Sequence, residues 1–346
     1  MTRIDISAHI LPKRYIDAVM AAAPAGFYMQ KRVSAIPTLV DLDARFRILD
    51  RFDDYVQVLS LALPPVEAVA SPGKSAELAR IANEELSALV TKYPDRFAAG
   101  VAGLPLNDVP ATLREIDHAV RRLGLRGVQL YTHINGKPLD DPDLLPIFEA
   151  VAELDVPIWL HPARGAAPPD YPGEKKSLYE IWHVFGWPFD TTIAMTRMIF
   201  SGLFDRFPTL KVITHHLGGT VPFLESRIKN AYDQFGTRTA DEDYGALLRK
   251  LKKHPHEYYR MFFADTALYG SPSALECGLA FFGPEHVLFG SDMPFDAEGG
   301  SRYIRQTLDA IERMTATPEV KRRMLHDNAA RLLGLPRTNR SDHSDG

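Results

Sequence analysis

The feature that most constrains the fold is a regular alternation of short apolar runs, rich in β-branched or aromatic residues, with longer stretches of helical period. This alternation is typical of strand–helix units around a parallel sheet. Eight such units in about 300 residues favour an α/β fold of the closed (β/α)₈ type, the TIM barrel, over two Rossmann-like halves. The predicted strands are residues 3–7, 55–62, 97–104, 127–132, 156–160, 211–214, 259–264 and 286–290.

Two segments break this rhythm, and we expect them to be inserted loops. Residues 23–41 follow the first predicted strand, and residues 163–188, rich in proline, glycine and aromatic side chains, follow the fifth. Both come after the carboxyl end of a strand, where the loops of a barrel build its active site. We expect one barrel domain over residues 1–336 and a polar tail over residues 337–346.

Composition and charge exclude several classes of function. The 40 basic and 44 acidic side chains give a net charge of −4, which argues against a nucleic-acid or anionic-membrane partner. Cys277 is the one cysteine, so neither an intramolecular disulfide nor a thiolate metal cluster can form. We find no secretory signature, no run of 18 apolar residues and no dinucleotide or P-loop fingerprint. We therefore expect a cytoplasmic protein.

Histidine and aspartate residues follow several predicted strands at their carboxyl ends. His9, His161, His215, His216 and Asp292 come after the first, fifth, sixth and eighth strands. In a closed barrel these strand ends meet at one mouth. Imidazole nitrogens and a carboxylate oxygen can hold a divalent cation there and leave a position open for water or substrate. The sequence therefore predicts a metal site at the mouth.

Five motifs spread along the chain carry a family resemblance. IDISAHILP begins at Ile4, HPARG follows Leu160, and the others are GWPFDTT at 186–192, SGLFDRFPTLKVITHHLGG at 201–219 and FGSDMPFD at 289–296. Together they resemble the amidohydrolase superfamily, and within it the branch of aminocarboxymuconate-semialdehyde decarboxylase and γ-resorcylate decarboxylase. The resemblance extends from Ile4 to about Leu335, with the motifs in the order of the family.

The resemblance implies roles for the residues at the mouth. His9, His161 and Asp292 match the family's ligands to one divalent metal, with zinc as the first expectation and manganese as the alternative. The family's sixth-strand histidine precedes a glycine-rich turn and acts on metal-bound water or substrate, which implies a catalytic role for His216 together with Asp292. Because His215 and His216 are neighbours in an extended segment, we expect only one of them to reach the mouth.

The chain departs from the family at Ser7, two residues before His9. The family carries histidine or glutamate there as its first metal ligand, whereas a serine hydroxyl is a poor ligand for zinc or manganese. A metal held with extra water, a weaker and exchangeable metal, or no metal at all could result. We expect the metal to be retained, because three protein ligands with open water positions are usual for catalytic zinc.

Substrate recognition in this branch uses arginine and aromatic residues around the metal. DARFRILDRF resembles the family's segment with a substrate-carboxylate arginine, which indicates Arg45 or Arg47. Arg227 resembles an arginine that reaches the active site across a dimer interface, so the resemblance implies a homodimer. His183 stands where relatives place an aromatic substrate contact, and Trp187 lies nearby in an apolar lid over a planar substrate.

The resemblance implies a metal-dependent, non-oxidative decarboxylase, a carbon–carbon lyase that acts on a small planar aromatic or dienoic carboxylate. The alternative within the superfamily is a hydrolase or hydratase that uses metal-activated water. A third hypothesis is a noncatalytic barrel that has lost its metal with the first ligand and serves as a binding or scaffold protein. The presence of His161, His216 and Asp292 favours an enzyme.

Overall fold

Eight parallel strands lie where the sequence predicts them in the computed structural model, which describes residues 1–335. Each strand overlaps the apolar run that predicted it. A separate antiparallel hairpin consists of β5 (His133–Ile134) and β6 (Lys137–Pro138). The eight parallel strands are β1 (Arg3–Ile10), β2 (Tyr55–Leu61), β3 (Phe97–Gly100), β4 (Val128–Tyr131), β7 (Ile158–His161), β8 (Val212–Thr214), β9 (Phe263–Asp265) and β10 (Val287–Leu288).

Backbone pairing closes these strands into a barrel. The orders are β1-β2-β3 in one sheet and β10-β9-β8-β7-β4 in the other. Single bridges join the two sheets at both edges, between Ala102 and Val128 and between Ala8 and Met293. The strands therefore follow one another around the barrel in chain order, and their carboxyl ends share one mouth.

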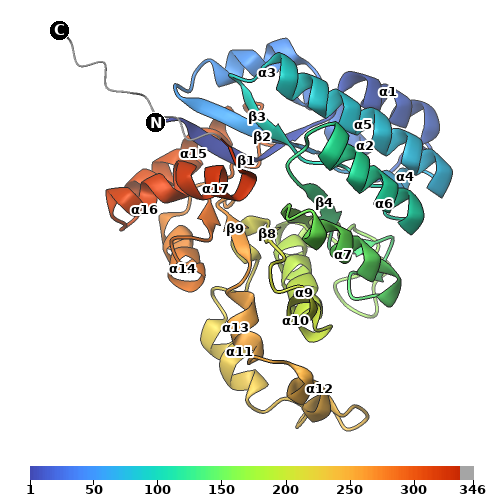
Figure 1. The fold of residues 1–346 in the computed structure, drawn as a ribbon, viewed down its shortest axis with the longest axis vertical. Helices are drawn as coiled ribbons and strands as arrows, with labels where there is room; N and C mark the ends of the chain where they lie inside the picture. Colours follow the sequence, from blue (N-terminus) through green and yellow to red (C-terminus); the bar gives the residue numbers. More distant parts are fainter. Residues whose placement is uncertain (336–346) are drawn as a thin grey trace.

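Helices connect successive strands and form the outer layer (Figure 1). In chain order they are α1 (Lys13–Ala22), α2 (Gln30–Ser34), α3 (Leu42–Leu49), α4 (Val66–Val69), α5 (Pro72–Lys92), α6 (Val109–Asp117), α7 (Leu145–Glu153), α8 (Ile181–Val184), α9 (Gly186–Phe200), α10 (Leu203–Arg206), α11 (Glu225–Tyr232), α12 (Tyr244–Lys250), α13 (Pro255–Tyr259), α14 (Pro272–Phe282), α15 (Ser301–Arg313), α16 (Pro318–Arg322) and α17 (Asn328–Leu333). Short turns of other helix types are η1 (Pro37–Leu39), η2 (His118–Arg122), η3 (Pro142–Leu144), η4 (His216–Gly218) and η5 (Arg323–Asp327).

Helix α5 illustrates how the sequence pattern places the outer layer. Leu78, Ala82 and Leu86 recur every fourth residue, and all three are fully buried. They form one apolar stripe that packs toward the sheet. Pro72 stands in the first turn, where its missing N–H costs no hydrogen bond within the helix.

Apolar side chains fill the barrel below the mouth. Trp159 on β7 reaches across the interior and donates its indole N–H to the carbonyl oxygen of Ile6 on β1 at 2.8 Å. It belongs to one buried cluster with side chains of several other strands and of α17. Gly127 leaves room for this ring, since a Cβ at that position would lie 2.3 Å from it. The interior is therefore packed, and the polar strand-end residues gather above it.

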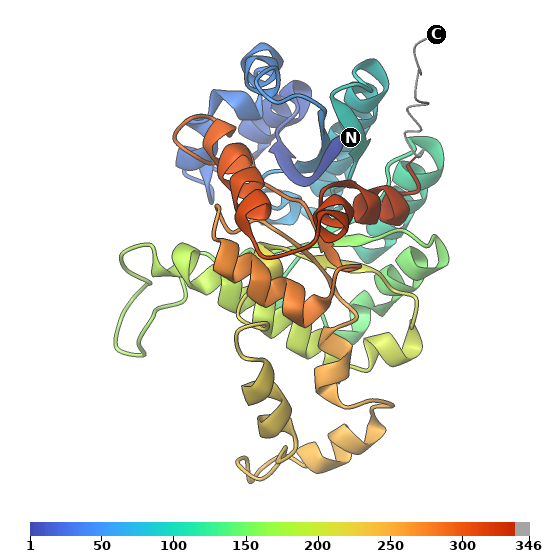
Figure 2. The same ribbon diagram turned by 90° about the vertical axis from the view of Figure 1, so that its left-hand side faces the viewer.

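Two connections extend beyond the barrel. One follows β7 within the segment 163–188 and projects as a loop before α8 and α9 (Figure 2). The other follows β8 and contains α11, α12 and α13, which lie below the barrel in Figure 1. This second extension is not evident from the sequence, because residues 220–258 keep an ordinary mixture of helical period and polar residues.

No helix within residues 1–335 combines the length and the apolar composition needed to cross a membrane. The expected cytoplasmic location stays a prediction. The predicted tail, residues 337–346, lies outside the described residues.

A buried carboxylate fastens the closure between the last strand and the first. Asp5 accepts hydrogen bonds from the backbone amides of Ser7 at 3.1 Å and Ser291 at 3.0 Å, and from the hydroxyl groups of Ser291 and Tyr55. Burial raises the pKa of Asp5, while these donors act against the rise by stabilising the anion. Because Ser291 immediately precedes Asp292, these bonds determine where the eighth strand places Asp292.

Glu67 in α4 is a second buried carboxyl group, but it lacks the hydrogen-bond donors that surround Asp5. Neither of its carboxyl oxygens has a hydrogen-bond partner among the described residues. Burial raises the pKa of Glu67 from 4.5 to about 8. The folded protein therefore holds a proton on Glu67 at neutral pH that the unfolded chain has already released.

This difference predicts that Glu67 destabilises the fold as the pH rises. Between about pH 5 and pH 8 the folded state binds more protons than the unfolded state, so the free energy of unfolding falls as the pH increases. We expect the stability of Glu67→Gln relative to the wild type to increase by about 2–4 kcal/mol over this range. Urea denaturation followed by circular dichroism measures it. The matched control is Glu77→Gln, at an exposed glutamate, and equal pH slopes for the wild type and Glu67→Gln would contradict the prediction.

Candidate active site

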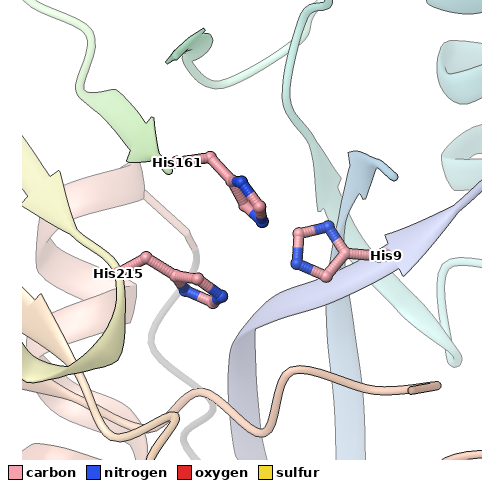
Figure 3. Close-up of side chains that lie close together, drawn as sticks. All are labelled: His9, His161 and His215. Carbon is pink, nitrogen blue, oxygen red and sulfur yellow. The ribbon is translucent and has the colours of Figure 1, made fainter. Parts of the chain in front are cut away.

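Three buried histidines face one another at the mouth (Figure 3). His9 lies near the end of β1, His161 ends β7, and His215 directly follows β8. One ligand nitrogen of each lies within 4.8 Å of the others. The rings of His161 and His215 stack with their centroids 4.8 Å apart, and His9 meets both edge-on. Residues far apart in sequence meet here because parallel strands deliver their ends to one rim.

Hydrogen bonds set the orientation of each ring. Nδ1 of His9 lies 3.3 Å from the carbonyl oxygen of Leu61, and Nδ1 of His161 lies 2.7 Å from the carbonyl oxygen of the next residue. Nδ1 of His215 pairs with the carboxylate of Asp265. In a neutral ring, a proton on Nδ1 leaves the lone pair on Nε2. Nε2 of His9 makes no well-aligned hydrogen bond among the residues that the structure describes, although Oδ1 of Asp292 lies 3.2 Å away.

Asp292 completes the cluster from the eighth strand. Its Oδ1 lies 3.2 Å from Nε2 of His9 and 3.3 Å from Nε2 of His215. Its Oδ2 accepts a hydrogen bond from the hydroxyl of Tyr269 at 2.8 Å and lies 3.9 Å from Nε2 of His216. Burial opposes ionisation, but the positive charge of His215 and its hydrogen bond hold the pKa of Asp292 well below its usual value.

Both adjacent histidines reach this site, so the prediction that only one of them would do so is wrong. Strand β8 ends before them, and His216 adopts a left-handed φ of +52° where η4 begins. The alternation of a strand no longer applies there, and the two rings lie 4.1 Å apart. Burial, helped by the charge of His215, lowers the pKa of His216 to about 3. Burial acts in the same direction on His215, but Asp265 and Asp292 outweigh it and raise its pKa to about 10.

Ser7 lines a small gap together with His9, His161 and His215, but its hydroxyl is engaged in a hydrogen bond. Its hydroxyl donates to Oδ2 of Asp265 at 2.7 Å. Neither Asp265 nor Tyr269 is among the site residues predicted from the sequence. Asp265 directly follows the seventh predicted strand, so the strand-end rule that selected His161 would also have found it. Tyr269 lies in the loop beyond β9, where no pattern distinguishes it.

A cavity of about 330 Å³ opens beside the cluster, and His161 and Asp292 form part of its wall. This volume suits a small organic ligand. Arg32 is the one arginine or lysine among the described residues that line this cavity. The remaining wall residues, many of them aromatic, are Met29, Leu63, Glu180, Trp182, His183, Trp187, Tyr269, Phe295 and Tyr303.

His183 and Trp187 both line this cavity, where the sequence analysis expects a lid. Their ring centroids lie 4.4 Å apart. The indole N–H of Trp187 donates to the carbonyl oxygen of Arg164 at 2.8 Å, which fixes the orientation of that ring. Burial lowers the pKa of His183, so this side chain presents a neutral ring to the cavity.

The two arginines expected to bind the substrate carboxylate lie elsewhere, and the structure contradicts that prediction. Arg45 is fully buried, and its guanidinium donates to Oε1 of Gln57 at 2.9 Å and to the carbonyl oxygen of His9 at 2.8 Å. Burial lowers the pKa of Arg45 to about 10. Arg45 therefore holds the end of β1 in place. Arg47 is exposed on α3 and is not part of the cavity wall.

Arg227 is exposed on α11, outside the cavity wall. Its expected role requires a second subunit and stays a prediction. The structure thus brings together His9, His161, His216 and Asp292, with His183 and Trp187 at the adjoining cavity. It adds His215, Asp265, Tyr269 and Arg32 to the residues selected from sequence.

This chain is similar in sequence and fold to proteins that are already known. The family profile for amidohydrolases matches residues 4–335. A 2-amino-3-carboxymuconate-6-semialdehyde decarboxylase from Dictyostelium discoideum is 29% identical over 96% of this chain and 92% of its own length. A gamma-resorcylate decarboxylase from Rhizobium sp. (strain MTP-10005) is 32% identical over 75% of this chain and 78% of its own length.

A solved structure extends the comparison to the fold. The dihydroxybenzoic acid decarboxylase from Polaromonas sp. JS666, with bound manganese and the inhibitor 2-nitroresorcinol, has a TM-score of 0.77 at 26% identity. The match covers 96% of this chain and 97% of that one. The family and branch predicted from the motifs are confirmed. This chain belongs to the amidohydrolase family, in the branch that contains these decarboxylases.

Proposed function

We propose that this chain is a metal-dependent, non-oxidative decarboxylase of small planar aromatic or dienoic carboxylates. The observation that carries the proposal is the buried cluster of imidazole nitrogens around Asp292, which adjoins a cavity lined by aromatic rings and one arginine. The relatives are named as decarboxylases of 2-amino-3-carboxymuconate 6-semialdehyde and of γ-resorcylate, both carboxylates of this kind.

The donor set fits a divalent cation held by His9, His161 and Asp292. Nε2 of His9 and Oδ1 of Asp292 lie 3.2 Å apart without a well-aligned hydrogen bond, and a cation between these two buried acceptors would satisfy both. We propose zinc, with manganese as the alternative, since nitrogen and carboxylate donors accept either ion. When bound, such a cation supplies positive charge to the substrate oxygens and stabilises the negative charge that develops as carbon dioxide leaves.

Substrate binding falls to the cavity wall. The guanidinium of Arg32, which also donates a hydrogen bond to the carbonyl oxygen of Phe295, can pair with an anionic group of the substrate. Trp187 and His183 offer ring faces and edges to a planar molecule. We propose that the segments 23–41 and 163–188, which contribute Arg32 and these rings, are the inserted loops that cover the substrate and exclude water.

A proton must reach the carbon that loses carbon dioxide. When the carbon–carbon bond breaks, its electron pair stays on the substrate carbon, which then takes up a proton. We propose that His216 and Asp292 relay this proton, the ionised carboxylate acting as an acceptor that passes it on, and what supports this is the 3.9 Å separation of Nε2 and Oδ2. A neutral imidazole has one N–H and one lone pair, so His216 can pass a proton onward. The hydroxyl of Tyr269 holds Oδ2 of Asp292 in position.

We also propose that the enzyme is a homodimer. Phe185 and Phe189 are exposed one helical turn apart at the start of α9. Phe223, which is 84% exposed, comes three residues after Thr220. The hydroxyl of Thr220 shares a hydrogen bond with the hydroxyl of Thr192 on α9. Exposed aromatic side chains gathered in this way are typical of a protein interface. Arg227 stands one turn beyond Phe223, where a partner subunit would meet it.

We expect the purified protein, loaded with zinc or manganese, to release one carbon dioxide per substrate consumed from at least one member of a panel of hydroxybenzoates and muconate-like acids. Removal of the metal by a chelator abolishes the release, and adding it back restores the release. Coupled detection of carbon dioxide with chromatography of the products measures this. Metal-loaded, folded protein that decarboxylates no member of the panel would count against the proposal.

A variant and a label make this test sharper. We expect His216→Asn to lower kcat by about 10²–10⁴-fold, because it removes a proton-transfer group, and to leave the metal content unchanged.

Turnover in oxygen-18 water separates decarboxylation from hydrolysis or hydration. Product that gains the label from water through catalysis would favour the hydrolytic alternative.

Arg32 provides a second prediction, about substrate affinity. Loss of a charge-assisted hydrogen bond to the substrate costs about 1.5–3 kcal/mol, so we expect Arg32→Met to lower kcat/KM roughly 10- to 100-fold, mainly through KM. Arg32→Lys recovers part of the loss because it keeps the charge. Arg47→Met is the matched control at an exposed arginine, and an equal effect of both methionine variants would refute the assignment.

A further inference from the structure

In the family, the residue two before the first-strand histidine is a metal ligand. Here that residue is Ser7, and it makes a hydrogen bond to another side chain instead. Ser7 is buried, and its hydroxyl donates to Oδ2 of Asp265 at 2.7 Å. Gly290 permits this close approach, since a Cβ at residue 290 would lie 2.8 Å from the Ser7 Oγ and 2.9 Å from the Asp265 Cβ. The hydroxyl therefore lies beside the histidine cluster, with its proton donated to a carboxylate oxygen that also pairs with His215.

The same Asp265 oxygen holds an additional imidazole. Nδ1 of His215 pairs with Oδ2 of Asp265, and the opposite nitrogen, Nε2, lies 3.3 Å from Oδ1 of Asp292. A carboxylate behind Nδ1 with the other nitrogen directed at a cation is the usual carboxylate–histidine–metal arrangement. His215 is also distinct from His216, the neighbour that fits the sixth-strand catalytic position.

The ligand nitrogens meet around His215. One donor atom of His215 lies within 4.8 Å of donor atoms of both His9 and His161, and the same limit holds for one donor atom each of His215, His216 and Asp292. In Figure 3 the rings of His9, His161 and His215 point toward one another from three different parts of the barrel. His215 thus belongs to both groups.

We propose that His215 supplies the metal ligand that Ser7 cannot supply, and that Ser7 acts as a positioning residue by fixing Asp265 behind His215. The metal is then held by His9, His161, His215 and Asp292, which restores four protein ligands by using a different strand. The inference rests on the proposed function only in assuming that a divalent metal binds at this mouth. The metal ligand lost at Ser7 is then replaced by the metal ligand gained at His215.

A rival role for His215 is a permanent ion pair between Asp265 and Asp292. In that role its Nε2 carries a proton and a positive charge, which would exclude it from the coordination sphere of a cation. The two roles therefore predict opposite effects on metal binding when His215 is replaced. Loss of a competing cation would strengthen binding, whereas loss of a ligand would weaken it.

The test measures zinc bound to the purified full-length protein by elemental analysis, and zinc affinity by chelator competition. We expect about one zinc per wild-type chain, and His215→Ala to lose more affinity than the roughly 10–100-fold that Asp265→Asn loses as a supporting residue. His216→Ala, the adjacent histidine, retains its zinc. Zinc bound by His215→Ala as tightly as by the wild type would overturn the proposal, as would loss of zinc in His216→Ala alone.

A rescue and a measurement on the wild type keep the test decisive if a variant folds poorly. In the His215→Ala background, Ser7→His returns a ligand to the first strand, and we expect zinc binding to recover at least tenfold. X-ray absorption of the zinc-loaded wild type counts the bound imidazoles. Three imidazoles support the proposal, and two refute it. Neither measurement depends on turnover. Three zinc-bound imidazoles on a protein that releases no carbon dioxide would therefore refute the proposed function and leave the ligand proposal standing.

Discussion

The hydrogen bonds to the buried carboxylate of Asp5 are the interaction on which the rest of the site depends. They join the first strand to Ser291. The backbone amide of Asp292 adds a further bond between the same two segments by donating to the carbonyl oxygen of Ser7 at 2.9 Å. His9 and Asp292 come from opposite ends of the chain, yet their ligand atoms lie 3.2 Å apart. A buried carboxylate is tolerated when donors compensate its lost hydration. Here that compensation also closes the barrel directly beneath the site.

Behind three of the residues at the mouth, a polar side chain holds the residue in place. Arg45 donates to the carbonyl oxygen of His9, Asp265 pairs with His215, and Tyr269 donates to Asp292. Each of these contacts restricts an orientation before any ligand arrives. Such preorganisation matters because a group held in its working geometry need not be ordered during the reaction. The supporting groups also explain why so many polar side chains are buried near this end of the barrel.

The sequence predicts the strands, the mouth and most of the residues that meet there, because strand period and strand ends are local patterns. It fails where the outcome depends on tertiary packing or on one dihedral angle. The left-handed backbone at His216 brings two neighbouring histidines to one site, whereas strand alternation separates them. Arg45 matches a substrate-binding motif, yet the fold buries its guanidinium against Gln57 and the backbone. No local pattern distinguishes Tyr269, which only the folded chain brings to Asp292.

A closed parallel barrel has a further property that bears on Ser7. Its strands deliver their ends to one rim, so the identity of a ligand matters more than the strand that carries it. A ligand missing from the first strand can then be replaced from the sixth without any change in the path of the backbone. The exchange needs a partner for the new imidazole, which Asp265 provides, and a small residue at position 7, which leaves room for that pair. On this argument, the serine in the first motif and the doubled histidine after the sixth strand have a single physical explanation.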